Sequence, residues 1–97
     1  MENNLGQHFD NVAALMKDQK DLKKTPSNDD LKTIYGLFKQ ATIGDVNIDR
    51  PGMFDLTGKA KWDAWNSFKG KSQEEAKHLY VDYCKKFFKD EVAARFN

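Results

Sequence analysis

The side chains that most often carry out covalent chemistry are few in this sequence and widely separated. It contains one cysteine, Cys84, and two histidines, His8 and His78. Nucleophilic catalysis needs a base and an orienting group held beside the nucleophile, and the spacing of these residues shows no such grouping. The histidines also lack the i, i+4 or Cys-x-x-Cys spacing of a zinc site, and Cys84 falls in an apolar helical stripe. We therefore predict a protein that is not an enzyme and has no bound metal or cofactor, with Cys84 in its core.

A second candidate for metal chemistry is the segment Asp45-Val46-Asn47-Ile48-Asp49, because oxygen ligands at alternate positions can coordinate calcium. The rest of such a loop is missing. Its sixth position holds Arg50, where the turn needs glycine, and its twelfth holds Leu56, where a bidentate glutamate would complete the coordination. We interpret these Asp and Asn residues as turn-forming.

Lysine and aromatic residues are interleaved in the second half of the chain. Residues 59–89 contain eight lysines and four acidic residues. A solvated helix face beside a core is the ordinary origin of such a pattern, and stacking of bases with phosphate contacts is the functional alternative. Tyr35 and Lys39 are four residues apart on an expected helix, and Lys59 and Lys61 follow a long loop. This arrangement favours a single phosphorylated nucleotide over a polymer.

Length and charge limit the classes of protein that this chain can belong to. It has 97 residues, which supports one domain over residues 1–97, and 16 basic against 15 acidic residues give a net charge of +1. This balance does not favour a nucleic-acid partner. The longest apolar run, Val12 to Met16, is too short to span a membrane. Because Met1 to Asn4 lacks the basic start of a secretory signal, we expect a cytoplasmic protein.

The spacing of apolar residues is helical and predicts an all-α protein. The first helix carries Leu5, Phe9, Val12, Ala13 and Met16 on one face and is expected to end in the lysine-rich stretch before Pro26. Ser27 is expected to cap a second helix that Gly44 ends. Its apolar stripe consists of Leu31, Ile34, Tyr35, Phe38 and Ala41.

An irregular loop is expected from Asp45 to Thr57, because Arg50-Pro51-Gly52 disfavours helix. A short third helix follows over about residues 58–68, with at least one of Trp62 and Trp65 in the core. Ser72 to Glu75 has the S-x-x-E pattern of a capping box and predicts the start of the last helix. Four helices with three connections indicate a small bundle.

Three segments of the chain resemble the acyl-CoA-binding protein family. They are Tyr35-x-x-x-Lys39-Gln40-Ala41-Thr42-x-Gly44-Asp45, Arg50-Pro51-Gly52 and Lys59-Ala60-Lys61-Trp62-x-x-Trp65, followed by Ser72, Ala76 and Tyr80. The similarity extends over about residues 9–89. It implies a four-helix bundle with up-down-down-up order. It also implies an intracellular carrier that binds medium- to long-chain fatty acyl-CoA thioesters, maintains a pool of them and performs no chemistry on them.

The resemblance also implies which residues hold the ligand. Tyr35, Lys39, Lys61 and Tyr80 are expected around the adenosine 3'-phosphate of CoA, with the two lysines supplying the charge. Lys20 is expected to approach the nucleotide from the first helix, and Leu31 and Phe38 are expected to line the adenine and acyl region. The ligand that the resemblance implies is acyl-CoA itself, and the protein is expected to be a monomer.

The sequence departs from the family pattern at three places. Thr57 stands where many members have lysine, and Lys32 replaces a common apolar contact beside the acyl chain. Phe9 lies 17 residues before Pro26, so the first helix is expected to be about one turn longer than in short members.

Two other functions remain as alternatives. One is a helical interaction module or weak nucleic-acid binder that uses the lysine and tryptophan residues. The other is an acyl-CoA thioesterase, for which the sequence offers no positioned nucleophile or base. Polymer binding would weaken steeply with salt and ignore acyl length, whereas a carrier depends on the tail.

Overall fold

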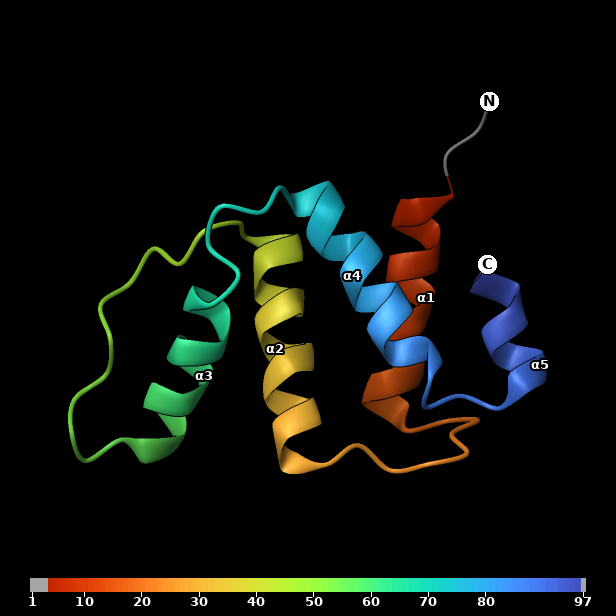
Figure 1. Cartoon of the computed structure of the whole chain (residues 1–97), viewed down its shortest axis with the longest axis horizontal. Helices are drawn as coiled ribbons and strands as arrows, with labels where there is room; N and C mark the ends of the chain where they lie inside the picture. The colour runs from red at the N-terminus through yellow and green to blue at the C-terminus, as the bar shows by residue number, and fades with distance from the viewer. Residues whose placement is uncertain (1–3, 97) are drawn as a thin grey trace.

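The computed structural model describes residues 4–96, which fold into a flat arrangement of helices. In chain order these are α1 (Leu5–Asp18), α2 (Asn28–Thr42), α3 (Leu56–Asn66), α4 (Gln73–Lys85), the short α5 (Asp90–Ala93) and a 3-10 turn η1 (Ala94–Phe96). Helices α1 and α4 run in one direction and α2 and α3 in the other (Figure 1). This confirms the predicted all-α bundle with up-down-down-up order. Residues Met1 to Asn3, on which the expectation about a secretory signal partly rests, lie outside the described residues.

Helix α4 lies between α1 and α2 and packs against both, while α3 packs only on the far side of α2 (Figure 1). The core therefore forms around α4, which contributes Ala76, Tyr80, Val81 and the fully buried Cys84. The prediction that Cys84 belongs to the core is confirmed. Burial raises the pKa of its thiol to about 12, so it remains protonated at neutral pH.

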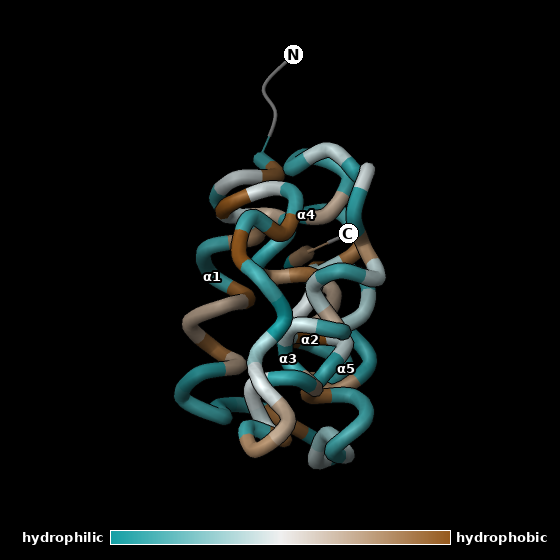
Figure 2. Tube along the Cα trace, turned by 90° about the vertical axis from the view of Figure 1, so that its left-hand side faces the viewer, coloured by the Kyte–Doolittle hydropathy of each residue, from teal (hydrophilic) through white to brown (hydrophobic). Residues whose placement is uncertain are grey.

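Hydrophobic and hydrophilic stretches alternate along the helices (Figure 2). Each helix therefore has a buried and a solvated side, as amphipathic helices of a bundle do. Among residues 4–96, none of the helices combines the length and the hydropathy needed to cross a membrane.

The ends of the helices follow local hydrogen bonds. At α2, Ser27 Oγ accepts the Asp30 N–H and the Asp30 carboxylate accepts the Ser27 N–H, which completes a capping box and confirms the predicted start. At α4, Ser72 Oγ accepts the Glu75 N–H, which confirms the predicted start of the helix and gives the serine half of the predicted capping box. The Glu75 carboxylate lies 3.7 Å from the Lys71 ammonium. The residues that cap α2 and α4 are therefore readable from sequence.

The end of α1 differs from the prediction. The helix stops at Asp18, before the lysine-rich stretch, because Gln19 adopts the left-handed conformation with φ 53°. The N–H of Lys20 then bonds the carbonyl of Leu15 and the N–H of Gln19 bonds that of Met16, as in a Schellman motif. Lys20 thus lies outside the helix. The long spacing from Phe9 to Pro26 is taken up by the connection over residues 19–27.

Two further predictions about the helices were wrong. Helix α3 begins at Leu56 because the Asp55 carboxylate accepts the Gly58 N–H at 2.8 Å, so Thr57 belongs to the helix and not to the loop. The segment after α4 is also helical, over residues 90–96, and was not predicted. Its apolar anchors are Val92 and Phe96, which are too few to show a helical period by themselves.

The connection between α2 and α3 is long, but hydrogen bonds hold it against the helices at several points. Trp62 Nε1 donates to the Ile48 carbonyl at 2.7 Å, and Arg50 forms two hydrogen bonds of 2.9 Å with the Asp63 carboxylate. Asp45 Oδ1 accepts the Gly70 N–H and the Gln40 side-chain amide. These bonds lower the pKa of Asp45, with the Gly70 N–H as the largest cause. Asp45 therefore joins two turns, in agreement with its interpretation as a turn-forming residue.

A hydrogen bond between helices makes stability depend on pH. The Tyr83 hydroxyl donates to Asp30 Oδ1 at 2.6 Å, joining α4 to the first turn of α2. Mainly for this reason the pKa of Asp30 falls from 3.8 to about 2, and the pKa of Tyr83 rises. A carboxyl group whose pKa is lower in the folded protein than in the unfolded chain stabilises the fold at pH values above the unfolded-state pKa. This stabilisation is lost as pH falls through the folded-state pKa.

We therefore expect Tyr83→Phe to lower the free energy of unfolding at neutral pH and to approach wild type between about pH 4 and about pH 2. Urea unfolding of both proteins across this range measures the difference. Asp30→Asn serves as the control, because it should show the same reduced pH dependence. A wild-type advantage that stays constant down to pH 2 would contradict the assignment.

Candidate ligand-binding site

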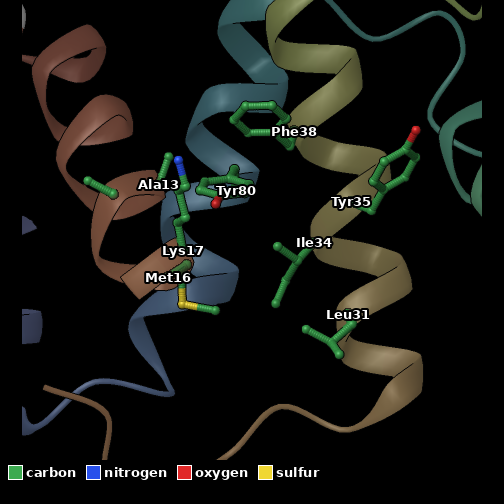
Figure 3. Close-up of a pocket in the computed structure, with 9 residues that line it drawn as sticks. Ala13, Met16, Lys17, Leu31, Ile34, Tyr35, Phe38 and Tyr80 are labelled. Carbon is green, nitrogen blue, oxygen red and sulfur yellow. The ribbon is translucent and has the colours of Figure 1, made fainter. Parts of the chain in front are cut away.

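An apolar groove lies between α1 and α2. It has a volume of about 470 Å³ and is lined by Ala13, Ala14, Met16, Lys17, Leu31, Ile34, Tyr35, Phe38 and Tyr80. Figure 3 shows that these side chains come from three helices, with Tyr80 of α4 at the back of the groove. The groove exists because α4 separates α1 from α2 in the bundle. Its apolar walls suit a hydrocarbon ligand.

Tyr80 forms an aromatic cluster with two neighbours. Its ring centroid lies 5.0 Å from that of Phe9 and 6.0 Å from that of Phe38, and only 3% of Tyr80 is exposed. Burial, with Cys84 beside it, raises the pKa of Tyr80. The hydroxyl therefore stays protonated at neutral pH.

A second cavity of about 420 Å³ lies between α2 and α3, with Leu56, Lys61, Leu31 and Tyr35 in its lining. Lys32 and Thr57, the two residues that depart from the family pattern, line it as well. Leu31 and Tyr35 belong to both cavities. The two cavities therefore share part of α2 as a common wall.

Two lysines predicted as ligand residues lie where α2 packs against α3. Lys39 of α2 lies next to α3, and Lys61 of α3 lies next to α2. The Lys61 ammonium lies 5.4 Å from the centroid of the Tyr35 ring, and the Lys39 ammonium lies 4.8 Å from that of Trp65. Within the described residues neither lysine forms an ion pair with a carboxylate. Both ammonium groups therefore remain able to bind an anion.

The structure brings some of the predicted residues together and separates others. Tyr35, Lys39 and Lys61 gather on the α3 side of α2, and Figure 3 shows the Tyr35 hydroxyl pointing away from the groove. The buried Tyr80 lies on the other side of α2, between Phe9 and Phe38. The four residues expected around one phosphate are thus distributed over both sides of α2.

Lys20 lies apart from this group. It lines a different and more polar groove, next to residues of α1 and the C-terminal segment such as His8 and Arg95. Lys17 occupies the position expected for a helix 1 lysine, since it lines the apolar groove with Tyr35 and Tyr80 and its side chain runs along the α1 side of the groove in Figure 3. Sequence reasoning missed Lys17. The signal was available, because Lys17 is four residues after Ala13 on the same helix face.

Among residues 4–96, no three His, Cys, Asp or Glu side chains are grouped so that they could hold a metal ion. His8 packs edge-on against Phe96, with ring centroids 5.5 Å apart. The site therefore combines cationic, phenolic and apolar groups, which is a set suited to binding.

Sequence comparison identifies relatives of this chain. A profile described as acyl CoA binding protein matches residues 6–84. Acyl-CoA-binding protein homolog 1 of Caenorhabditis elegans is 53% identical over 73 residues, which cover 75% of this chain and 81% of that protein. The matched profile range contains all seven predicted ligand residues.

Solved structures are similar in fold as well as in sequence. The crystal structure of acyl-CoA-binding protein 2 from Oryza sativa has a TM-score of 0.78 and 41% identity, covering 96% of this chain and 98% of that one. The crystal structure of ACBP from Moniliophthora perniciosa has a TM-score of 0.74 and 39% identity, covering 94% and 90%. The similarity in fold therefore extends over nearly the whole chain.

Proposed function

Because this chain belongs to the acyl-CoA-binding protein family, we propose that it binds medium- to long-chain fatty acyl-CoA thioesters and carries them without chemical change. The observation that carries this proposal is the junction of two kinds of surface. The apolar groove and the cavity lined by Lys61 share Leu31 and Tyr35, and Lys39 lies one turn after Tyr35 on the same helix, over the Trp65 ring. An acyl-CoA molecule has the same two parts, a hydrocarbon tail and a polyanionic nucleotide.

In this proposal the charged end of the ligand is held by Lys39 and Lys61, with the Tyr35 hydroxyl as a further donor. Each charge-assisted hydrogen bond to the 3'-phosphate contributes about 1.5 to 3 kcal/mol after desolvation. Tyr80, on the other side of α2, contacts the part of the ligand that enters the apolar groove. Leu31 and Phe38 cover the adenine and the start of the acyl chain. Lys17 takes the role that the resemblance implied for Lys20.

The remaining affinity comes from the tail. Each methylene removed from water contributes about 0.8 kcal/mol, so affinity increases with acyl length until the groove is filled. Lys32 and Thr57 add polar groups to the second cavity. We infer that they influence which chain lengths bind best.

We further propose that the protein carries acyl-CoA and maintains a pool of it, and that it does not hydrolyse the thioester. Its single thiol, Cys84, is fully buried and has a pKa raised to about 12, so no thiolate is available for attack on a thioester. We also propose that the protein is one domain over residues 1–97, that it is a cytoplasmic monomer and that it has no nucleic-acid partner.

Calorimetry with three ligands tests the proposal. Palmitoyl-CoA should bind far more tightly than CoA, which lacks the tail, or palmitate, which lacks the nucleotide. Equal affinity for palmitate and palmitoyl-CoA would overturn the proposal. Tight binding of an oligonucleotide that weakens steeply with salt would favour the nucleic-acid alternative.

A further inference from the structure

Gly36 lies in the interior of α2, where glycine weakens a helix relative to alanine, and it is buried. The packing of α3 gives the reason for a glycine at this position. A methyl group on Gly36 would lie 2.7 Å from the Ala64 carbonyl carbon and 2.9 Å from Phe68 Cε2, and closer still to the Ala64 carbonyl oxygen. The absence of a side chain therefore allows α2 and α3 to approach each other closely at this point.

A side chain at Gly36 could not be accommodated by a change of rotamer alone. The nearest atoms belong to the backbone of α3, so the two helices would have to move apart. Helix α3 packs against α2, and Figure 1 shows it on the far side of α2 from α1 and α4. A substitution at Gly36 would therefore shift α3 relative to the rest of the bundle.

The two contacts between lysines and aromatic rings lie on either side of this close approach. Tyr35 directly precedes Gly36, and the Lys61 ammonium lies 5.4 Å from the centroid of its ring. Lys39 follows Gly36 by one turn of α2, and its ammonium lies 4.8 Å from the centroid of the Trp65 ring. The approach of the two helices at Gly36 thus sets how far Lys61, on α3, lies from Lys39, on α2.

Two ammonium groups that hold one phosphate must lie at a fixed separation, because hydrogen bonds weaken steeply with distance and angle. A binding group displaced by about 1 Å already weakens a site. We propose that Gly36 is a positioning residue, which sets the distance between Lys39 and Lys61 and thereby the affinity for the phosphate of the nucleotide. The effect on affinity rests on the proposed function, whereas the effect on the distance does not.

Calorimetry tests the effect on affinity. Gly36→Ala should bind palmitoyl-CoA at least about fivefold more weakly than wild type, which is part of the loss of one charge-assisted hydrogen bond. For palmitoyl-CoA without the 3'-phosphate, the two proteins should differ by less than about twofold. Gly6→Ala is the matched control and should bind as wild type does, because it makes the same change in α1 where nothing lies within 4 Å of the added methyl group.

A double-mutant cycle with Lys61 separates positioning from a general loss of stability. If Gly36 acts by placing Lys61, then Gly36→Ala should weaken binding by less than about twofold in the Lys61→Ala protein, because the lysine that it positions is absent. Equal losses in the wild-type and Lys61→Ala backgrounds would overturn the proposal. Wild-type affinity in a folded Gly36→Ala variant would overturn it as well.

NMR of the ligand-free protein tests the distance independently of any ligand. In wild type, nuclear Overhauser effects should connect the ring protons of Tyr35 with the methylene protons of Lys61. These effects should weaken in Gly36→Ala and remain unchanged in Gly6→Ala. Their absence in wild type, or equal intensity in wild type and Gly36→Ala, would show that Gly36 does not set this distance.

Circular dichroism checks that each variant is folded. If Gly36→Ala does not fold, the same comparisons use Gly36→Ala/Phe68→Leu against Phe68→Leu, since the shorter side chain removes one of the contacts of the added methyl group. Weak binding of palmitoyl-CoA by wild type would reject the proposed function, and the Overhauser effects would still decide the role of Gly36 in the distance. Tight binding by wild type with equal losses in the cycle would reject only the positioning role.

Discussion

Lys61→Ala is expected to weaken palmitoyl-CoA binding by about ten- to a hundredfold while leaving the thermal midpoint nearly unchanged. The expected loss corresponds to one charge-assisted hydrogen bond to the nucleotide phosphate. Lys61 is exposed and its ammonium contacts the Tyr35 ring at 5.4 Å, so its removal costs the fold little. Calorimetry measures the affinity, and thermal unfolding of the free protein measures the stability.

Two lysines at the end of α1 provide the comparison that makes this result specific. Lys17 lines the apolar groove with Tyr35 and Tyr80, whereas Lys20 lines the separate groove beside the C-terminal segment. Lys17→Ala should therefore weaken palmitoyl-CoA binding, and Lys20→Ala should stay within about twofold of wild type. Equal losses in Lys20→Ala and Lys61→Ala would indicate attraction by overall charge and would contradict the assigned site.

Trp65→Ala is expected to lower the free energy of unfolding by about 3 to 5 kcal/mol. The Trp65 side chain is 3% exposed, its Nε1 donates to the Gly44 carbonyl at 2.7 Å, and the Lys39 ammonium lies over its ring. Truncation would leave a cavity between α2 and α3 and remove the partner of the Gly44 carbonyl. Urea unfolding at neutral pH measures the loss.

The neighbouring tryptophan is the matched control. Trp62 is only half-buried, and its Nε1 donates to the Ile48 carbonyl in the connection to α3. Trp62→Ala should therefore cost about 1 to 2 kcal/mol, most of it from that hydrogen bond. Similar losses for Trp62→Ala and Trp65→Ala would show that the burial of Trp65 does not govern the stability of the α2–α3 contact.

Local sequence was sufficient wherever a hydrogen bond within a few residues decides the structure. Ser27 and Ser72 predicted the starts of α2 and α4 because a cap is made between residues three apart. The spacing of Tyr35 and Lys39 also predicted that they share one helix face, because residues four apart are neighbours on a helix surface. The end of α1 escaped prediction because it depends on Gln19 taking a left-handed conformation, which glycine normally marks.

The sequence by itself determined the four long helices, their order and the family resemblance, and it predicted Lys39 and Lys61 as residues that bind a phosphate. Only the tertiary structure decided that Tyr80 is buried against Phe9, that Lys17 and not Lys20 lines the groove, and that Phe54 lies in solvent. The physical reason is the distance along the chain over which each kind of interaction acts. Helical period and caps act within one or two turns, whereas burial depends on how distant helices pack, and an apolar residue has the same local signal whether a neighbouring helix covers it or not.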